Sequence, residues 1–324
     1  MSEITLRRAG LADAAAITAV HCSTVDHWRD PHTREIVPAT ALDLYGRWRN
    51  GGPWMSVETC APHLNQLLLE GHLPLVAELE GRIVAEAEFY CDPEPGPTAA
   101  LHLSILYVHR DFQRRGLGRM LVQAGCEAAL ARGLPALTTQ PETEAQAFYR
   151  RLGFVPWQRH KELQLRAEGK PPATLRPLTH KILLPPALAL RIGRYQCGAQ
   201  GWDGLWPALA LPGWGDLPRQ VWQGTLADTP VLLGLRQQLL DRSQADGYAW
   251  LPPQAPLAPA VAALGALAAQ AGYHAVDLLL PEAELPALRQ TFRLDYQTTV
   301  ALWRYELPKA GAAPAAPADL TAIT

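Results

Sequence analysis

One stretch, from His102 to Gly118, restricts most strongly what this chain can fold into. It reads HLSILYVHRDFQRRGLG: an apolar strand over 101–108, a short polar loop, and two glycines, Gly116 and Gly118, where a helix begins. A helix that starts directly after a glycine-rich turn presents unpaired backbone N–H groups and the positive end of its dipole. The stretch therefore predicts an anion site, and phosphate groups are the simplest ligand for it.

The composition indicates a cytoplasmic protein with two domains. With 324 residues, 48% hydrophobic and 19% charged, the chain is long enough for two globular cores. A net charge of −2 gives no reason to expect nucleic acid or a membrane as a partner. The five cysteines are odd in number and lack a CxxC pair, which favours free thiols in a reducing cytosol. The N-terminus has no apolar signal-peptide segment, so we expect no export.

Hydrophobic periodicity predicts alternating strands and helices on both sides of this stretch. The expected strands are 4–8, a hairpin of 75–79 with 82–90, then 101–108, 136–139 and 155–165. The expected helices are 11–22, 57–69, 117–133 and 142–152.

The second half of the chain repeats the first. PETEAQAFY at 141–149 matches PEAELPALR at 281–289, and the helix around Gly125 matches one around Gly265. The segment between strand and helix is shorter in the second copy and lacks QRRGLG. The second copy therefore keeps the expected architecture without the anion loop.

The repeat sets the expected domain limits. We predict domains over 1–168 and 174–307, with a Pro-rich linker between them. The last residues, 308–324, are rich in alanine and proline and are expected to form a disordered tail.

Residues 3–165 resemble the GNAT superfamily of acetyl-CoA-dependent N-acetyltransferases. The run from Val108 through Gln113 to Gly118 fits the family's Q/R-x-x-G-x-G/A coenzyme A motif without a gap, and the order of elements around it also fits. The resemblance implies an α/β protein of tandem acyl-CoA N-acyltransferase (GNAT) folds, each a mixed, mostly antiparallel central sheet flanked by helices. It implies acetyl-CoA as co-substrate, and no metal is expected.

The motif implies which residues bind the cofactor. Backbone N–H groups from Gln113 to Arg119 can cradle a pyrophosphate, because glycine allows close approach of the backbone. Glu142 stands where the family often has Asn, which puts the usual hydrogen bond to pantetheine in doubt. The expected cofactor-binding residues are Leu106, Tyr107, Val108, Gln113, Arg114, Arg115, Gly116, Leu117, Gly118, Arg119, Glu142 and Phe148.

Acetyl transfer to an amine needs a base and an acid. An alkylamine with a pKa of about 10.4 is mostly protonated at pH 7, so a base must remove its proton. The departing thiolate then needs a proton. Residues 145–154, AQAFYRRLGF, resemble the family's A-x-x-(L/F)-Y-x-x-x-G-F segment, whose Tyr commonly protonates the sulfur. Tyr149 is therefore the expected acid.

His102 is the expected base. Relatives place Glu or His six residues before the Val, and arylalkylamine N-acetyltransferases, which the run resembles, have His there. An imidazole with a pKa near 6.5 can accept a proton at neutral pH. The two-residue period of a strand places four side chains on one face: His102, Ser104, Leu106 and Val108. Glu86, Glu88 and a water molecule are the alternatives, and at least one of the two carboxylates is expected on a solvated sheet face.

Residues 24–56 and the hairpin are expected to form the acceptor site. Their aromatic side chains suit a cationic or aromatic amine: His27, Trp28, Trp48 and Trp54. Arg289 replaces Tyr149 in the second copy, which should therefore shape the acceptor cleft and not catalyse. The tandem arrangement resembles mycothiol synthase, but that enzyme keeps its catalytic copy at the C-terminal end, so its substrate is not carried over.

The expected reaction is direct transfer of acetyl to a primary amine of a small molecule or peptide within a ternary complex. A non-catalytic acyl-CoA-binding or regulatory module is the alternative. The sequence leaves open the acceptor amine, the acyl chain length and the oligomeric state, monomer or homodimer.

Overall fold

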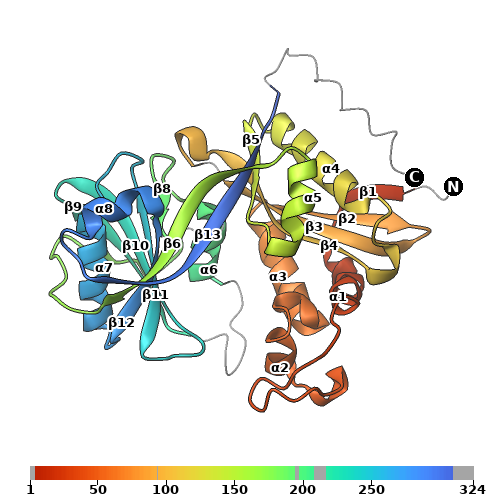
Figure 1. Ribbon diagram of the computed structural model, residues 1–324, viewed down its shortest axis with the longest axis horizontal. Coiled ribbons are helices and arrows are strands. Elements are labelled where there is room, and N and C mark those ends of the chain that lie inside the picture. Colours follow the sequence, from red (N-terminus) through yellow and green to blue (C-terminus); the bar gives the residue numbers. More distant parts are fainter. Residues whose placement is uncertain (1–3, 93, 194–196, 208–216, 309–324) are drawn as a thin grey trace.

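A computed structural model describes residues 4–92, 94–193, 197–207 and 217–308, and the predicted tail lies almost wholly outside these ranges. Two lobes lie side by side in Figure 1, and one sheet of 13 strands runs through both of them. No helix within the described ranges is both long and apolar enough to cross a membrane.

The strands of the first lobe form an antiparallel meander that ends in one parallel strand: β1 (Ile4–Arg8), β2 (Leu73–Leu79), β3 (Arg82–Asp92), β4 (Ala100–Val108) and β5 (Ala136–Thr139). The predicted hairpin turns at Glu80 and Gly81, which both have positive φ, 51° and 76°. Turns of this kind match the right-handed twist of the paired strands.

Helices cover both faces of this part of the sheet. On one face lie α1 (Ala14–Cys22) and α3 (Val57–Leu69), and α2 (Leu44–Trp48) lies beyond them in contact with α3; on the other face lie α4 (Leu117–Ala131) and α5 (Gln146–Arg151). Strand β2 shows the alternation: Val76 packs with α1 and α3, whereas Leu75 and Ala77 pack with α4. A Cβ at Gly125 would lie 2.3 Å from the ring of Phe89, so this glycine allows α4 to contact β3 closely.

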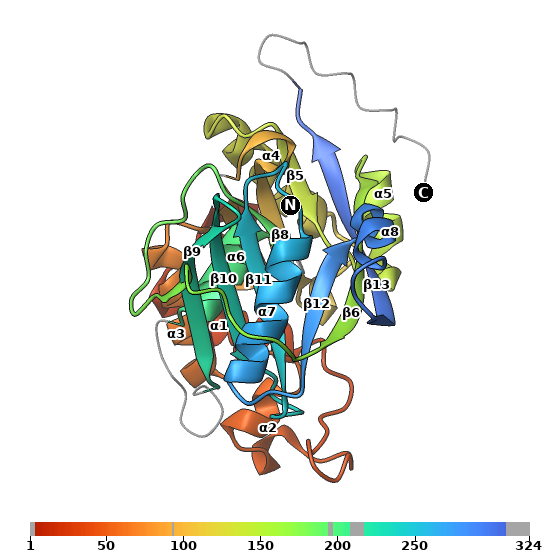
Figure 2. The same ribbon diagram turned by 90° about the vertical axis from the view of Figure 1, so that its left-hand side faces the viewer.

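The second lobe repeats this order, as the sequence predicts. Its elements are β7 (Arg176–Pro177), β8 (Ala189–Ile192), α6 (Gly198–Leu205), β9 (Arg219–Leu226), β10 (Thr229–Gln237), β11 (Gln244–Leu251), α7 (Ala258–Gln270), β12 (Ala275–Pro281) and α8 (Leu285–Leu288). Strand β11 pairs antiparallel with β10 and parallel with β12, as β4 does with β3 and β5. Helix α7 covers one face of this part of the sheet (Figure 2).

The two lobes exchange their last strands. These are β6 (Val155–Arg166) from the first repeat and β13 (Leu294–Glu306) from the second, and the central strand order is β5-β13-β6-β12. Strand β13 therefore pairs with β5 of the first repeat, and β6 pairs with β12 of the second. Figure 1 shows both strands crossing between the lobes. Neither repeat completes its sheet without a strand of the other, which the periodicity of the sequence does not reveal.

Candidate active site

The predicted anion loop has the backbone of an anion cradle. Gly116 caps α4 with a left-handed backbone (φ 82°), and Arg114 before it also has positive φ, 60°. No side-chain hydrogen bond caps this helix end within the described residues. A Cβ at Gly116 would meet no atom within 4 Å, so the loop opens to solvent on this side. The first-turn N–H groups are therefore available to phosphate oxygens.

Next to the loop, β4 separates from β5. The parallel pairing of the two strands ends at Leu103 and Thr139, but β4 continues to Val108. A Cβ at Gly118 would lie 3.3 Å from Cζ of Phe148 and 3.6 Å from Cδ2 of Leu106. The start of α4 and α5 thus lie beside the outer part of β4, which pairs with β3 but no longer with β5. This open edge of β4, called the gap below, is where an extended chain can pair with the strand.

The polar side chains predicted at the cofactor lie around this gap. Arg114, Arg115 and Arg119 are exposed, and Arg115 donates to the backbone oxygen of Asp111 at 3.0 Å. Glu142 is exposed. Burial raises the pKa of the Tyr107 phenol, and the nearby charge of Glu142 raises it further. The residues present fit a nucleotide with several phosphates: N–H groups at a helix start, with exposed cationic side chains around them.

Tyr149 reaches the same gap from α5. Its ring packs against Phe148 and Phe154, with centroids 5.0 and 5.4 Å apart. Burial raises the pKa of Tyr149 to about 12, although a hydrogen bond with the Thr139 side chain opposes the shift. Thr139 is the last residue of β5, so the phenol lies where β4 and β5 part. Tyr149 therefore keeps its proton at neutral pH and can act as an acid.

A β-bulge corrects the predicted faces of β4. Glu88 pairs with Ile105 and Phe89 with Leu103, so Ser104 is the extra residue on β4. Leu106 and Val108 consequently pack with the α4 core, whereas Ser104 contacts α6 on the opposite face. The prediction that His102, Ser104, Leu106 and Val108 share one face is wrong, because the bulge shifts the alternation by one residue.

His102 is a buried residue with a side-chain partner on β5. It is 1% exposed, and its Nδ1 lies 3.0 Å from Oγ1 of Thr138. It is not among the residues that line the large cleft described below.

Glu88 forms a dyad with a histidine that the sequence did not single out. Oε1 of Glu88 accepts from Nε1 of Trp54 at 2.7 Å, and both carboxylate oxygens lie 3.0 Å from Nε2 of His63. Burial alone raises the pKa of Glu88, but the charge and hydrogen bonds of His63, together with the Trp54 bond, outweigh it and hold the pKa below its ordinary value. Burial acts to lower the pKa of His63, and Glu88 overcomes this and raises it.

The second carboxylate, Glu86, is also buried. Burial and the charge of Glu88 raise the pKa of Glu86 well above the ordinary value of a carboxyl group. It shares a hydrogen bond of 2.8 Å with His21, whose pKa burial lowers to about 3. The side chains of Glu86 and Glu88 are both less than 5% exposed. The expectation that at least one of them lies on a solvated sheet face is wrong, since α1 and α3 cover this face.

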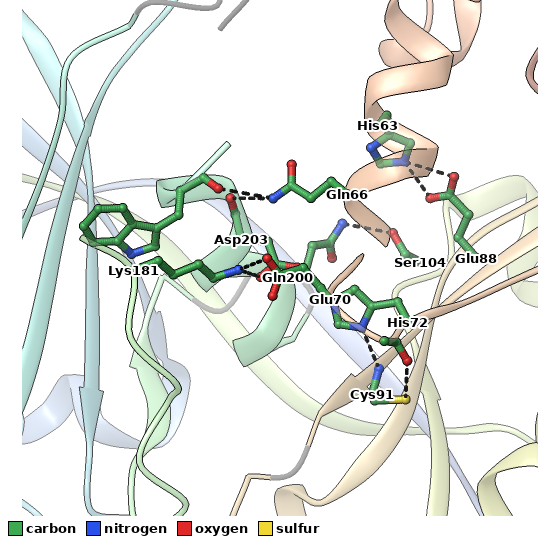
Figure 3. A network of polar contacts seen from close by, with 12 residues as sticks. His63, Gln66, Glu70, His72, Glu88, Cys91, Ser104, Lys181, Gln200 and Asp203 are labelled. Atoms are coloured by element: carbon green, nitrogen blue, oxygen red, sulfur yellow. Dashed lines mark hydrogen bonds and ion pairs between the residues drawn. The ribbon is translucent and has the colours of Figure 1, made fainter. Parts of the chain in front are cut away.

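A cleft of about 700 Å³ opens in front of the dyad, and both repeats line it. Trp48, Trp54 and His63 come from the first repeat, and Gln200 and Asp203 of α6 come from the second. Of the aromatic residues predicted at the acceptor site, Trp48 and Trp54 lie here; His27 and Trp28 do not. The side chain of His63 is 20% exposed, and Figure 3 shows its second ring nitrogen turned away from Glu88.

The sequence contained one signal for His63. In α3 it lies one turn before the buried Leu67, and its neighbours Cys60 and Leu64 are buried too. A histidine on such an apolar helix face needs a polar partner, and the sequence could not identify Glu88, 25 residues later, as that partner.

Ion pairs hold the second repeat against the first beside this cleft (Figure 3). Nε2 of His72 lies 2.8 Å from Oδ2 of Asp203, and its Nδ1 lies 3.2 Å from the backbone nitrogen of Cys91. Burial acts to lower the pKa of His72, but the hydrogen bond with Asp203 outweighs it, and the pKa is raised to about 9. Lys181 joins Glu70 of the first repeat, at 2.5 Å, to the other oxygen of Asp203, at 2.9 Å. These contacts fix α6 next to α3 and β3.

Among the described residues, the second repeat shows no open strand edge equivalent to that of β4. Strand β11 pairs with β12 only from Gln244 to Gly247, but β8 then pairs with its last residues, up to Leu251. The backbone N–H of Gly193, directly after β8, also donates to the oxygen of Leu279 on β12 at 2.9 Å. Strand β8 thus fills the space that the first repeat leaves open.

Comparison with known proteins gives a family match over part of the chain and a shared fold. Residues 33–154 match the model of the acetyltransferase (GNAT) family. A GCN5-related N-acetyltransferase from Anabaena variabilis is 12% identical, with a TM-score of 0.58 over 94% of this chain and 73% of that one. A GCN5-related N-acetyltransferase from Kribbella flavida is 13% identical, with a TM-score of 0.51 over 94% and 71%. At such identities the two structures indicate a shared fold alone. No curated protein sequence matches the chain.

Proposed function

Since residues 33–154 form a domain of the acetyltransferase (GNAT) family, we propose that this protein transfers acetyl from acetyl-CoA to a primary amine of a small molecule or peptide. The observation that carries the proposal is the parting of β4 from β5, with the anion loop at its outer end and a cleft on the α3 face. Such a gap lets a thioester and an amine meet from two sides of one sheet, so direct transfer in a ternary complex follows. The five cysteines all lie within the described residues and form no disulfide there, which suits a reaction in the cytoplasm.

The donor is proposed to bind along the loop and the gap. First-turn N–H groups of α4 and the exposed arginines would bind its phosphates, and Leu106 to Val108 would pair with its pantetheine arm. Phe148 and Gly118 would border the same arm, because they meet at the inner end of the loop. The second repeat would bind no donor, since β8 closes its gap.

His63 is the base that we propose, with Glu88 as the residue that orients it. Neutral His63 donates Nε2–H to Glu88, which leaves Nδ1 free to accept a proton from the amine. We prefer His63 to His102 because it lines the cleft, whereas His102 is buried and engaged with Thr138.

The reaction balances with one base and one acid. The amine nitrogen forms a bond to the acetyl carbon while the C–S bond breaks, and the proton lost by nitrogen goes to His63. The thiolate receives the phenolic proton of Tyr149, which burial keeps on the oxygen at neutral pH. Water restores the proton to Tyr149 and takes one from His63.

The test is thiol release from acetyl-CoA by the purified full-length chain with a diverse panel of amines. We expect release that depends on a primary amine, and loss of acetyl-CoA binding in Gly116→Trp. Gly272→Trp is the matched control, because Gly272 also has positive φ and open space around it, but lies at the end of α7 in the second repeat. Binding of acetyl-CoA without amine-dependent thiol release would instead favour a non-catalytic acyl-CoA-binding module.

A further inference from the structure

Helix α6 of the second repeat places Gln200 against strand β4 of the first repeat. Nε2 of Gln200 donates to Oγ of Ser104 at 3.0 Å, across 96 residues of sequence. Figure 3 shows the two side chains pointing toward each other. Ser104 is the bulge residue, directly after the last pair between β4 and β5. The amide of Gln200 therefore lies at the point where the gap opens.

The other atom of this amide lacks a partner. Oε1 of Gln200 is buried and accepts no hydrogen bond from any residue that the structure describes. A buried acceptor without a hydrogen bond lowers the stability of the folded protein by about 1–3 kcal/mol, so such groups usually have a partner. Gln200 also lines the cleft in front of His63. A molecule that enters this cleft can therefore supply the missing donor.

We propose that Oε1 of Gln200 accepts an N–H of the acceptor amine and holds its nitrogen at the bulge. This inference rests on the proposed function. An attacking primary amine has two N–H bonds: one proton passes to His63, and the other remains in the amide product. Gln200 binds the N–H that remains, so the second repeat supplies a positioning residue to the active site of the first.

The arrangement determines the class of acceptor. A secondary amine has one N–H as the free base, and that proton must leave during transfer. It therefore cannot supply both His63 and Gln200, and its substituent would point at the buried Oε1. The enzyme should consequently select primary amines over their N-methyl derivatives through Gln200.

The experiment compares kcat/KM for one primary amine from the panel and for its N-methyl derivative. We expect the parent protein to prefer the primary amine roughly tenfold, the effect of about one hydrogen bond. Gln200→Leu should reduce this preference to about one, with the KM for acetyl-CoA unchanged. Gln200→Glu keeps an acceptor oxygen and should keep the preference.

Gln223→Leu, at an exposed position of β9, is the control for a Gln-to-Leu change elsewhere in the second repeat. An equal fall of both kcat/KM values in Gln200→Leu would overturn the positioning role and leave the proposed function standing. Failure of the parent protein to release thiol with any amine would overturn both proposals, and it would be seen before any variant is compared.

Discussion

The contact between His72 and Asp203 gives a quantitative test of how the second repeat is held. Asp203→Ala removes the carboxylate that accepts from His72 and Lys181. His72 is 4% exposed, so losing its partner costs about 1–3 kcal/mol. The side chain of Lys181 is 23% exposed and still pairs with Glu70 in this variant, so the loss of its ion pair with Asp203 costs about 0–1 kcal/mol of stability. Alanine favours the helix by about 0.5 kcal/mol, so the net loss should lie between about 0.5 and 3.5 kcal/mol, with a central value of about 2 kcal/mol.

Urea unfolding followed by tryptophan fluorescence measures this loss. We expect one cooperative transition, because the lobes share exchanged strands, with a lower midpoint in Asp203→Ala. Asp26→Ala is the control, because Asp26 too is a paired carboxylate, with Arg110 at 2.7 Å, but its side chain is 77% exposed. The free energy of unfolding should fall by about 1 kcal/mol or less in this variant. Equal losses in the two variants would refute the reasoning that the buried contact holds the repeats together.

Three further predictions concern the reaction and its donor. Tyr149→Phe should lower kcat at neutral pH by about 10²–10³-fold while the KM for acetyl-CoA changes little, since only the acid is removed; full turnover in this variant would exclude the acid role. Glu88 raises the pKa of His63 above the ordinary 6.5, and a base must be neutral to accept a proton. The pH profile of kcat/KM should therefore have an acidic limb that rises at a pH above 6.5. This limb should vanish in His63→Gln, and its loss in His102→Gln alone would return the base role to His102. Calorimetry should find one acetyl-CoA bound per chain, as β8 closes the second gap, and two bound molecules would contradict this.

Much of the first repeat follows from its sequence alone. Alternating apolar residues and glycine turns predict the strands, the hairpin and the start of α4, because these elements depend on backbone preferences between near neighbours. The loop from Gln113 to Gly118 is likewise a local structure, so its glycine turn and the helix start after it could be predicted from the sequence. The repeat was visible because its two copies share their periodicity.

The tertiary structure decided what depends on distant partners. The bulge at Ser104 arises from its pairing with β3, and it reverses the faces that strand alternation alone predicts. Glu88 is buried and paired because α3 brings His63 onto it, and no local pattern specifies that contact. The exchange of β6 and β13, and the entry of Gln200 into the first repeat, join segments about a hundred residues or more apart. Such pairings are set by packing between whole elements, so the sequence by itself determined the parts of this protein, and only the fold decided which parts meet.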